Sequence, residues 1–450
     1  MRRSRLVLFL VLVCVLVVYL TVLKRHYDSH NALPQRHPAP KGFLTPHWPT
    51  GSRGRVQFGI MFDAGSTGTR VHVFKFRVDH NKSRVPELLD ESFKAFSPGL
   101  SAFAEDPPQS RAGLLQLLDF AKTKVPVQIQ ESTPVFLKAT AGLRLLKGDQ
   151  AQRLLDQVRQ VFRESSFLSS DQSVSVLDGA DEGVSAWLTV NFLLGAVGGA
   201  PAPASASASV GTLDLGGGST QVTFSPSSKF VESLSSSDAQ NLQNLNLFNS
   251  SYKLYTHSYL GLGLMEARAA VLGPPSAPGG AVLVSPCVSP DGGGTWEHDH
   301  ILYNVRGQRT GETTGETTGE TTGETTGSVL ELCSRRVRSV LRDSVRPVEQ
   351  QLQFYAFSYY YDRAVDIRAI DGVRGGEVCV QDYISAAQRV CAGETLSPDQ
   401  SPLLCLDLVY ISVLLQDLGF KPDSQLKLSR WIRGVETSWA LGATFNYMNL

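Results

Sequence analysis

A glycine-rich turn between two strand-like runs occurs twice in the sequence, and each copy follows an aspartate. Residues 59–70 contain the first copy with Asp63, and residues 211–221 contain the second with Asp214. Glycines let backbone N–H groups approach a phosphate closely, and an aspartate at a strand end can hold a metal ion or its water. The repetition predicts two related halves that face each other across a cleft, where both turns contact one phosphate chain.

Each turn alone also has a simpler interpretation, because a tight hairpin turn often carries glycine without binding a ligand. Neither copy contains the Gly-Lys-Ser/Thr sequence of a P-loop, and each is followed by an apolar strand rather than by a helix. The pair therefore indicates a phosphate-binding cleft that differs from a P-loop and from a dinucleotide fingerprint.

Two further segments carry polar residues at the ends of strand-like runs. Residues 137–144 lead from a strand into a small-residue turn, where Thr140 can offer a hydroxyl. Residues 174–183 lead from a strand into acidic residues, and Glu182 opens an apolar helical stretch. An acidic side chain at a helix start can stabilise the helix dipole or act as a general base. The residues alone leave both roles open for Glu182.

The overall composition narrows the class of fold and of partner. The 450 residues include 42 Lys plus Arg and 42 Asp plus Glu, so the formal net charge is zero. This balance lacks the basic excess that is typical of nucleic-acid-binding proteins. Helix-like and strand-like segments alternate, with the clearest helical periodicity at residues 111–124 and 150–162, which predicts an α/β fold.

The N-terminal part of the chain has a composition of its own. Residues 6–23 form a largely apolar run with arginines before it and Lys24 and Arg25 after it. Its length favours an uncleaved signal anchor over a cleavable signal peptide, and the slight cationic excess before it places the N-terminus in the cytoplasm. Residues 27–55 are rich in proline and predict an extended stem. The body would then lie in the secretory pathway lumen or outside the cell.

Cysteines and N-glycosylation patterns agree with that location. The triplets at Asn81 and Asn249 match the acceptor pattern. Of six cysteines, Cys14 lies in the apolar run, and the others lack the Cys-x-x-Cys spacing of a metal site. In an oxidising compartment these others allow two disulfides and one free thiol. The low-complexity segments at 198–210 and 311–326 predict exposed loops, and the second, a Gly-Glu-Thr-Thr repeat, is interpreted as a tolerated insertion.

Five short blocks in fixed order resemble the signature of the GDA1/CD39 family of ectonucleoside triphosphate diphosphohydrolases, also called apyrases. The blocks are residues 63–70, 139–144, 178–183, 214–221 and 436–442. The aromatic run at residues 354–362 is similar to the nucleoside-diphosphatase branch of that family, types 5 and 6, and the N-terminal anchor favours type 6. The resemblance extends over nearly all of the chain from Gly59 to Tyr447.

The resemblance implies an actin-like α/β fold of two RNase H-like domains with the nucleotide between them, beside Ca²⁺ or Mg²⁺. The expected organisation is a cytoplasmic tip and anchor at 1–26, a stem at 27–55, domain I at 56–178 plus 431–450, and domain II at 179–430. The repeat would lie in an insertion loop of domain II at 307–327.

The resemblance also implies roles for individual residues of the matching blocks. The general base would be Glu182, and the residues orienting the attacking water would be Ser219 and Gln221. The residues around the cation, mostly acting through bound water, would be Asp63, Asp214, Thr140 and Trp439. The residues holding phosphate oxygens would be Ser66, Thr67, Gly217 and Gly218. The best match for a residue that stacks on the base is Tyr359, although an aromatic run can equally be core packing.

Two more features of this branch carry expectations. Arg70 either adds a cation that fits the site to a diphosphate or forms a structural ion pair, and both alternatives are open. The branch is expected to have two disulfides, and the spacing suggests Cys287 with Cys333 and Cys391 with Cys405. Cys379 would remain unpaired.

The function implied by the resemblance is metal-dependent hydrolysis of nucleoside diphosphates, with GDP, UDP and IDP favoured over triphosphates. The enzyme would be a single-pass type II protein of the Golgi membrane, with the cell surface or secretion after cleavage as other locations. We expect a monomer that contacts the membrane through its N-terminal helix and binds no nucleic acid. Two alternatives stay open: a kinase on the same fold, and a protein that binds nucleotide without turnover.

Overall fold

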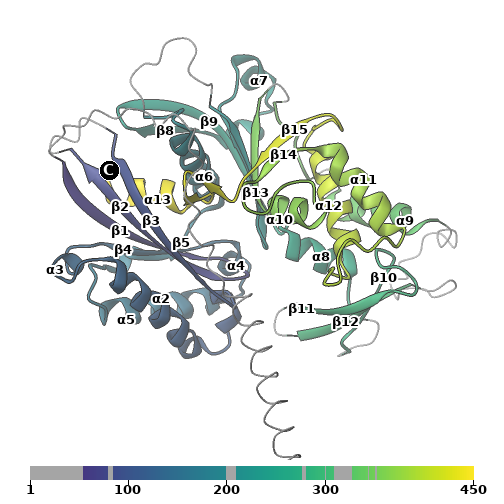
Figure 1. The fold of residues 1–450 in the computed structure, drawn as a ribbon, viewed down its shortest axis with the longest axis horizontal. Helices are drawn as coiled ribbons and strands as arrows, with labels where there is room; N and C mark the ends of the chain where they lie inside the picture. The colour runs from purple at the N-terminus through teal and green to yellow at the C-terminus, as the bar shows by residue number, and fades with distance from the viewer. Residues whose placement is uncertain are drawn as a thin grey trace, which may run out of the picture. The chain divides into compact units, whose positions relative to one another are not determined.

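Two mixed β-sheets, each flanked by helices, organise the chain and confirm the predicted α/β class (Figure 1). The computed structural model describes residues 54–79, 85–198, 209–275, 280–298, 301–308, 327–342, 344–349 and 352–450. The apolar run at 6–23, nearly all of the stem, Asn81, most of the segment at 198–210 and the repeat at 311–326 lie outside these residues. None of the described helices is both long enough and apolar enough to cross a membrane.

The first sheet has the strand order β3-β2-β1-β4-β5. Its strands are β1 (Arg55–Ala64), β2 (Thr69–Val78), β3 (Glu87–Phe96), β4 (Val135–Ala139) and β5 (Val174–Val176). Strand β2 is antiparallel to both β1 and β3, whereas β4 is parallel to both β1 and β5. The helices between these strands are α2 (Arg111–Lys124), α3 (Val127–Gln130), α4 (Ala141–Arg144) and α5 (Gln150–Arg163). Helices α2 and α5 confirm the predicted periodic segments, since their apolar residues share one core with β1 and β4.

The second sheet has the strand order β14-β15-β13-β6-β7-β9-β8. Its strands are β6 (Gly211–Leu215), β7 (Ser219–Phe224), β8 (Leu242–Leu247), β9 (Ser250–Leu260), β13 (Phe354–Ser358), β14 (Gly376–Cys379) and β15 (Gln425–Leu428). Strand β6 is antiparallel to β7 and parallel to β13, β7 is antiparallel to β9, and β13 is parallel to β15. The run β9-β7-β6-β13-β15 therefore repeats the order and directions of the first sheet, as the duplicated turn predicts.

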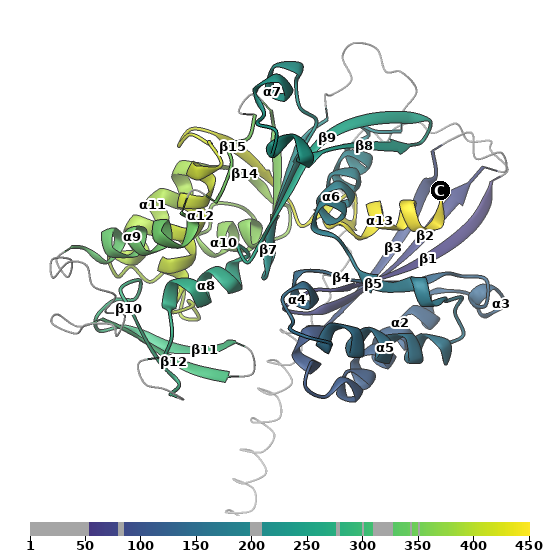
Figure 2. The same ribbon diagram turned by 180° about the vertical axis from the view of Figure 1, so that it is seen from behind.

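The helices of the second half form the largest core of the described residues, together with the second sheet. They are α7 (Ser228–Ser233), α8 (Leu264–Leu272), α9 (Val329–Leu341), α10 (Tyr359–Asp366), α11 (Val380–Cys391) and α12 (Leu404–Asp417). Helix α12 lies among α8, α9 and α11, which Figures 1 and 2 show from opposite sides. A small separate sheet consists of β10 (Val282–Ser285), β11 (Gly293–His298) and β12 (Ile301–Gly307).

Two helices from distant parts of the chain join the two halves. They are α6 (Gly179–Leu194) and α13 (Ala440–Met448), and the strands that precede α13 are β16 (Trp431–Ile432) and β17 (Val435–Glu436). Their apolar residues form a third core with the other face of the first sheet and with β8 and β9. A Cβ atom on Gly442 would overlap the backbone of Ser185, so only glycine allows this close crossing. The end of the chain is thereby fixed against the helix that carries Glu182.

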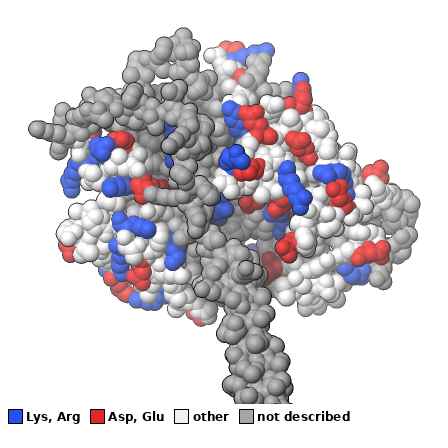
Figure 3. All heavy atoms as spheres, in the orientation of Figure 1, with Lys and Arg blue, Asp and Glu red and all other residues white. Residues whose placement is uncertain are grey.

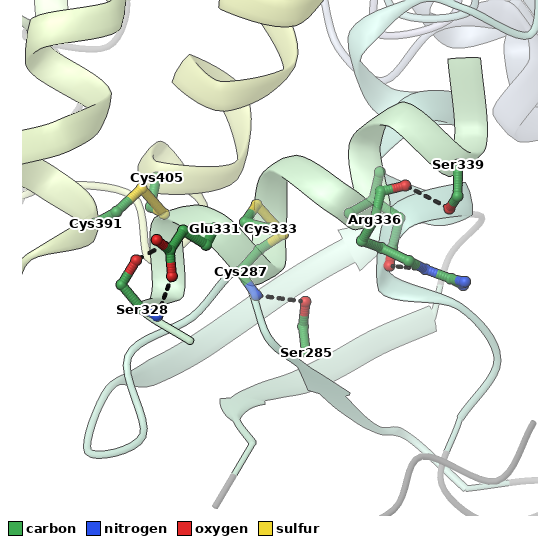
Figure 4. Close-up of a disulfide and its surroundings, with 10 residues drawn as sticks. Ser285, Cys287, Ser328, Glu331, Cys333, Arg336, Ser339, Cys391 and Cys405 are labelled. Carbon is green, nitrogen blue, oxygen red and sulfur yellow. Dashed lines mark hydrogen bonds between the residues drawn. A yellow bond between two sulfur atoms is a disulfide. The ribbon is translucent and has the colours of Figure 1, made fainter. Parts of the chain in front are cut away.

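Both predicted disulfides are confirmed (Figure 4). Cys287 is bonded to Cys333 of α9, and Cys391 at the end of α11 is bonded to Cys405 of α12. Cys379 is the free cysteine of the described residues. The first bond spans 46 residues of sequence that include the repeat insertion, so the ends of that long segment are held together whatever its length.

Lys and Arg side chains are interspersed with Asp and Glu side chains over the described part of the face in Figure 3. This mixture agrees with the zero formal net charge of the sequence. The described part of this face therefore offers no broad basic surface that would attract an anionic ligand.

Candidate active site

The two glycine-rich turns have the same backbone hydrogen bond. In the turn between β1 and β2, the Gly65 N–H donates to the Gly68 carbonyl at 3.0 Å. In the turn between β6 and β7, the Gly216 N–H donates to the Ser219 carbonyl, also at 3.0 Å. Because the two sheets share their topology, both turns leave the sheets at equivalent places. The predicted duplication is therefore present in the backbone as well as in the sequence.

The residues that face each other across these hairpins differ between the two copies. Asp63 is paired in register with Arg70 on β2, and Asp214 is paired with Gln221 on β7. The aspartates occupy equivalent positions, but the partner is a cation in one hairpin and an amide in the other. The duplicated backbone thus presents two different chemical groups.

The two turns border one cavity of about 200 Å³. All of the predicted site residues line it except Gln221, which is hydrogen-bonded to one of the lining residues. A Cβ atom on Gly217 would overlap the hydroxyl of Ser66, so the two turns approach each other closely at this point. The predicted phosphate-binding residues are Ser66, Thr67, Gly217 and Gly218, and the structure brings them together on this cavity wall.

Glu182 lies in the first turn of α6, with only 6% of its surface exposed. The helix begins at Gly179, earlier than the sequence predicted, because the Asp178 side chain accepts a hydrogen bond from the Ala180 N–H at 2.8 Å and caps it. The N-cap is therefore Asp178, and the Glu182 carboxylate is directed to the cavity instead. Burial raises the pKa of Glu182 to about 8, against the opposing charge of Arg144.

Arg144 is a site residue to which the sequence analysis assigned no role. Its Nη2 atom donates to Glu182 Oε2 at 2.7 Å and to Ser219 Oγ at 3.1 Å. Arg144 ends α4, a short helix where the sequence predicted only a turn, because the backbone after Thr140 continues into helical hydrogen bonds. The only sequence signal was its place at the end of a matching block, which does not reveal a partner on α6.

Ser219 and Gln221 belong to one hydrogen-bond network with Glu182. The Gln221 Nε2 atom lies 2.7 Å from Ser219 Oγ, 3.2 Å from Glu182 Oε2 and 2.9 Å from Ser258 Oγ. All of these groups are buried or nearly so, which makes their relative positions well defined. The network connects a carboxylate with a hydroxyl at the cavity wall, an arrangement that can orient a water molecule.

Asp214 lies on the second sheet, beside Ser358 at the end of β13. Ser358 Oγ donates to Asp214 Oδ1 at 2.6 Å. Ser358 has φ 58° and ψ −129°, a backbone conformation that is uncommon for a residue with a side chain and is concentrated at functional sites. Burial raises the pKa of Asp214 to about 6, the Ser358 hydrogen bond opposes this, and the charge of Asp63 adds to it.

Asp63 completes the acidic part of the cavity. Its Oδ2 atom accepts from Arg70 Nη1 at 3.1 Å, which is the ion pair that one interpretation of Arg70 expected. Its Oδ1 atom is buried without a hydrogen-bond partner in the described residues. A buried, unpaired carboxylate oxygen that repels the carboxylate of Asp214 suits a hard cation with oxygen ligands.

The same residues limit how a cation could be held. Among the described residues, no three His, Cys, Asp or Glu side chains lie close enough to form a metal site by themselves. Thr140 and Trp439 line the same cavity as the two aspartates. The hydroxyl of Thr140 offers oxygen, whereas an indole N–H can only donate and so could contact a water ligand but not the metal.

Tyr359 begins α10 and forms part of the cavity wall beside the first turn. It is half-buried, and Thr67 lines the same cavity. Of the two predicted glycosylation sites, Asn249 is exposed in the turn between β8 and β9, and Asn81 lies outside the described residues. The assigned roles of all these site residues remain predictions, although their positions agree with them.

The chain is similar to known proteins in both sequence and fold. A family model for GDA1/CD39 (nucleoside phosphatase) proteins matches residues 51–450. The ectonucleoside triphosphate diphosphohydrolase 6 of Mus musculus is 48% identical over 399 residues, which are 88% of this chain and 82% of the relative. The nucleoside diphosphate phosphatase ENTPD5 of Homo sapiens is 42% identical over 411 residues, which are 90% of this chain and 91% of the relative.

A crystal structure of nucleoside triphosphate hydrolases from Neospora caninum is similar in fold. The TM-score is 0.57 at 17% identity, and the similarity covers 87% of this chain and 92% of that chain. The family match extends from the start of the first sheet to the C-terminus and includes every residue that lines the cavity. The chain therefore belongs to the GDA1/CD39 family of nucleoside phosphatases, and it is an enzyme of that class.

Proposed function

We propose that this enzyme hydrolyses the terminal phosphate of nucleoside diphosphates with Ca²⁺ or Mg²⁺, and favours GDP, UDP and IDP over triphosphates. The observation that carries the proposal is the position of Glu182, which shares one cavity with both glycine turns and with Asp63 and Asp214. The name of the Homo sapiens relative, nucleoside diphosphate phosphatase ENTPD5, supports diphosphates as substrates. The matching topology of the two sheets supports the actin-like arrangement of two RNase H-like domains.

In the proposed reaction, Glu182 accepts a proton from a water molecule that Ser219 and Gln221 orient. The water oxygen attacks the terminal phosphorus, the bond from that phosphorus to the bridging oxygen breaks, and the nucleoside monophosphate leaves with the bridging oxygen. N–H and O–H groups of the two turns bind the phosphate oxygens as charge builds on them. A cation held by Asp63 and Asp214, mostly through water, would neutralise phosphate charge when bound.

The test of this function is phosphate release by the full-length protein from GDP, UDP, IDP, ADP, GTP and AMP. We expect release from the diphosphates with Ca²⁺ or Mg²⁺, loss of release with a chelator, and recovery when the cation is restored. AMP should give none, because it has no phosphoanhydride bond. A folded protein that releases no phosphate, or that releases it equally well with the chelator, contradicts the proposal.

We propose that residues 6–23 anchor the protein in the Golgi membrane and that the catalytic part of the chain lies in the lumen. We also propose that the protein is a monomer. The two disulfides support an oxidising compartment, and the exposed Asn249 supports access for glycosylation. Protease treatment of sealed membrane vesicles tests this orientation, because a lumenal catalytic part should be protected until detergent is added. Digestion of the catalytic part without detergent contradicts the proposed orientation.

Replacing Arg144 by methionine is expected to change the pH dependence of the reaction. The cation of Arg144 favours the charged form of Glu182, so its loss raises the pKa of Glu182 further. Because Glu182 must be deprotonated to accept a proton, the acid limb of the kcat/KM profile should move to higher pH by about one unit or more. The matched control is Arg153→Met, an exposed arginine of α5 paired with Asp149. An unchanged acid limb in Arg144→Met contradicts this role.

A further inference from the structure

One carboxylate in the cavity has no partner and no place in the proposed reaction. Asp362 lies three residues after Tyr359 on α10, and both side chains line the cavity. Residues three apart share one face of a helix, so Asp362 is beside the aromatic ring on the cavity wall. The neighbouring Arg363 is directed elsewhere, because its Nη1 atom donates to the buried Asp407 at 2.8 Å.

The side chain of Asp362 makes no hydrogen bond or ion pair with any described residue. Arg430 also lines the cavity, but its Nε atom lies 3.9 Å from Glu436. Burial raises the pKa of Asp362, and the cations of Arg363 and Arg430 oppose this by favouring the charged carboxylate. Asp362 is half-buried, so its carboxylate is accessible from the cavity and can accept hydrogen bonds from a ligand there.

The wall around Asp362 suits a flat ring. Tyr359 is a half-buried aromatic residue of the cavity wall, which the almost fully buried Phe357 and Tyr361 also line, and the glycine-rich turns contribute polar groups. A base that stacks on an aromatic ring exposes only its edge to hydrogen-bonding groups. If the phosphates lie at the turns and the base stacks on Tyr359, the edge of the base would reach the α10 wall, where Asp362 offers a carboxylate.

We propose that Asp362 selects the base of the substrate by accepting hydrogen bonds from its Watson–Crick edge. This inference rests on the proposed function, and it assigns base selection to one side chain. A carboxylate can only accept. Guanine offers two adjacent donors, N1–H and the N2 amino group, which match both carboxylate oxygens.

The other bases match a carboxylate less well. Hypoxanthine and uracil each offer one ring N–H. Adenine and cytosine place a ring-nitrogen acceptor beside the amino donor, so one carboxylate oxygen would face a lone pair. With Asp362 as the acceptor, the expected order is guanine, then hypoxanthine and uracil, then adenine and cytosine.

The decisive variant is Asp362→Asn, because an amide offers one acceptor and one donor of nearly the same shape. That pattern fits the amino group and ring nitrogen of adenine and cytosine. We expect the ratio of kcat/KM for GDP over ADP to fall by about tenfold or more, and kcat/KM for ADP and CDP to rise. A gain for the disfavoured bases is an outcome that loss of structure cannot produce.

Two variants and a binding measurement complete the test. Asp366→Asn changes a carboxylate of the same helix that is paired with Arg363 and does not line the cavity, and it should keep the wild-type ratio. Asp362→Ala should make the kcat/KM values for substrates with different bases more similar, without a rise in kcat/KM for ADP. Calorimetry with non-hydrolysable methylene analogues of GDP and ADP should show the same change in ratio without turnover.

The failures of the two proposals can be told apart. If the wild-type protein releases no phosphate from any diphosphate, the proposed function is wrong. If it hydrolyses diphosphates but Asp362→Asn and Asp362→Ala keep the wild-type ratios in both kinetics and binding, the role of Asp362 is overturned while the function stands.

Discussion

Glu182→Gln is expected to lower kcat for GDP by about 10²–10⁴-fold, the usual contribution of a general base. Glutamine has the same shape and can still hydrogen-bond to Arg144 and Gln221, but it cannot accept a proton from water at neutral pH. The substitution therefore removes the chemistry and leaves the network of hydrogen bonds largely in place. The measurement is phosphate release under saturating GDP and cation.

The control for Glu182→Gln is Glu164→Gln, which changes an exposed glutamate paired with Arg111 and should leave kcat unchanged. Binding of GDP to Glu182→Gln should persist, since the phosphate-binding turns are intact. A Glu182→Gln protein that keeps more than about a fifth of the wild-type kcat would show that another group accepts the proton.

Asp407→Asn is expected to destabilise the second half of the chain by about 3–5 kcal/mol, the usual effect of breaking a buried ion pair. Asp407 is fully buried, and both of its oxygens accept from Arg268, at 2.7 and 2.5 Å. It also accepts from Arg363, so its loss leaves the largely buried Arg268 without its anion and leaves Arg363 with only Asp366. Urea denaturation followed by tryptophan fluorescence measures the change.

Two comparisons make the Asp407 prediction specific. Asp399→Asn alters an exposed aspartate that has no described partner and should keep the wild-type midpoint. The double variant Arg268→Met with Asp407→Asn should lose less than the sum of the single losses, because the pair is removed together. Additive losses, or a loss below about 1 kcal/mol for Asp407→Asn, contradict the assignment of this pair as a main source of stability.

Local patterns in the sequence were sufficient to predict much of the fold and of the site. The periodicity of residues 111–124 and 150–162 corresponds to α2 and α5, and the two glycine turns are hairpins of equivalent sheets. The matching blocks identified residues that line one cavity, from Asp63 to Trp439. These features succeed because each depends on neighbouring residues or on a motif that is complete within a few positions.

Apart from the two disulfides that the family resemblance implied, contacts between distant residues could not be predicted from the sequence. Ser358 and Asp214 are 144 positions apart, and Arg268 and Asp407 are 139 positions apart. No local pattern indicates which buried charge meets which partner, because the meeting is decided by how whole elements pack. Arg144 was missed for the same reason, since its partner lies on another helix.

The two equivalent hairpins carry different side chains at the same backbone position of the active site. Arg70 and Gln221 occupy the same place in two copies of one backbone, each opposite an aspartate. A symmetric frame therefore holds an asymmetric pair, with a cation paired with Asp63 on one side and a neutral amide beside the carboxylate of Glu182 on the other. The side chain in one hairpin can change without altering the backbone of the other hairpin. The group opposite Asp63 and the group opposite Asp214 can therefore vary separately.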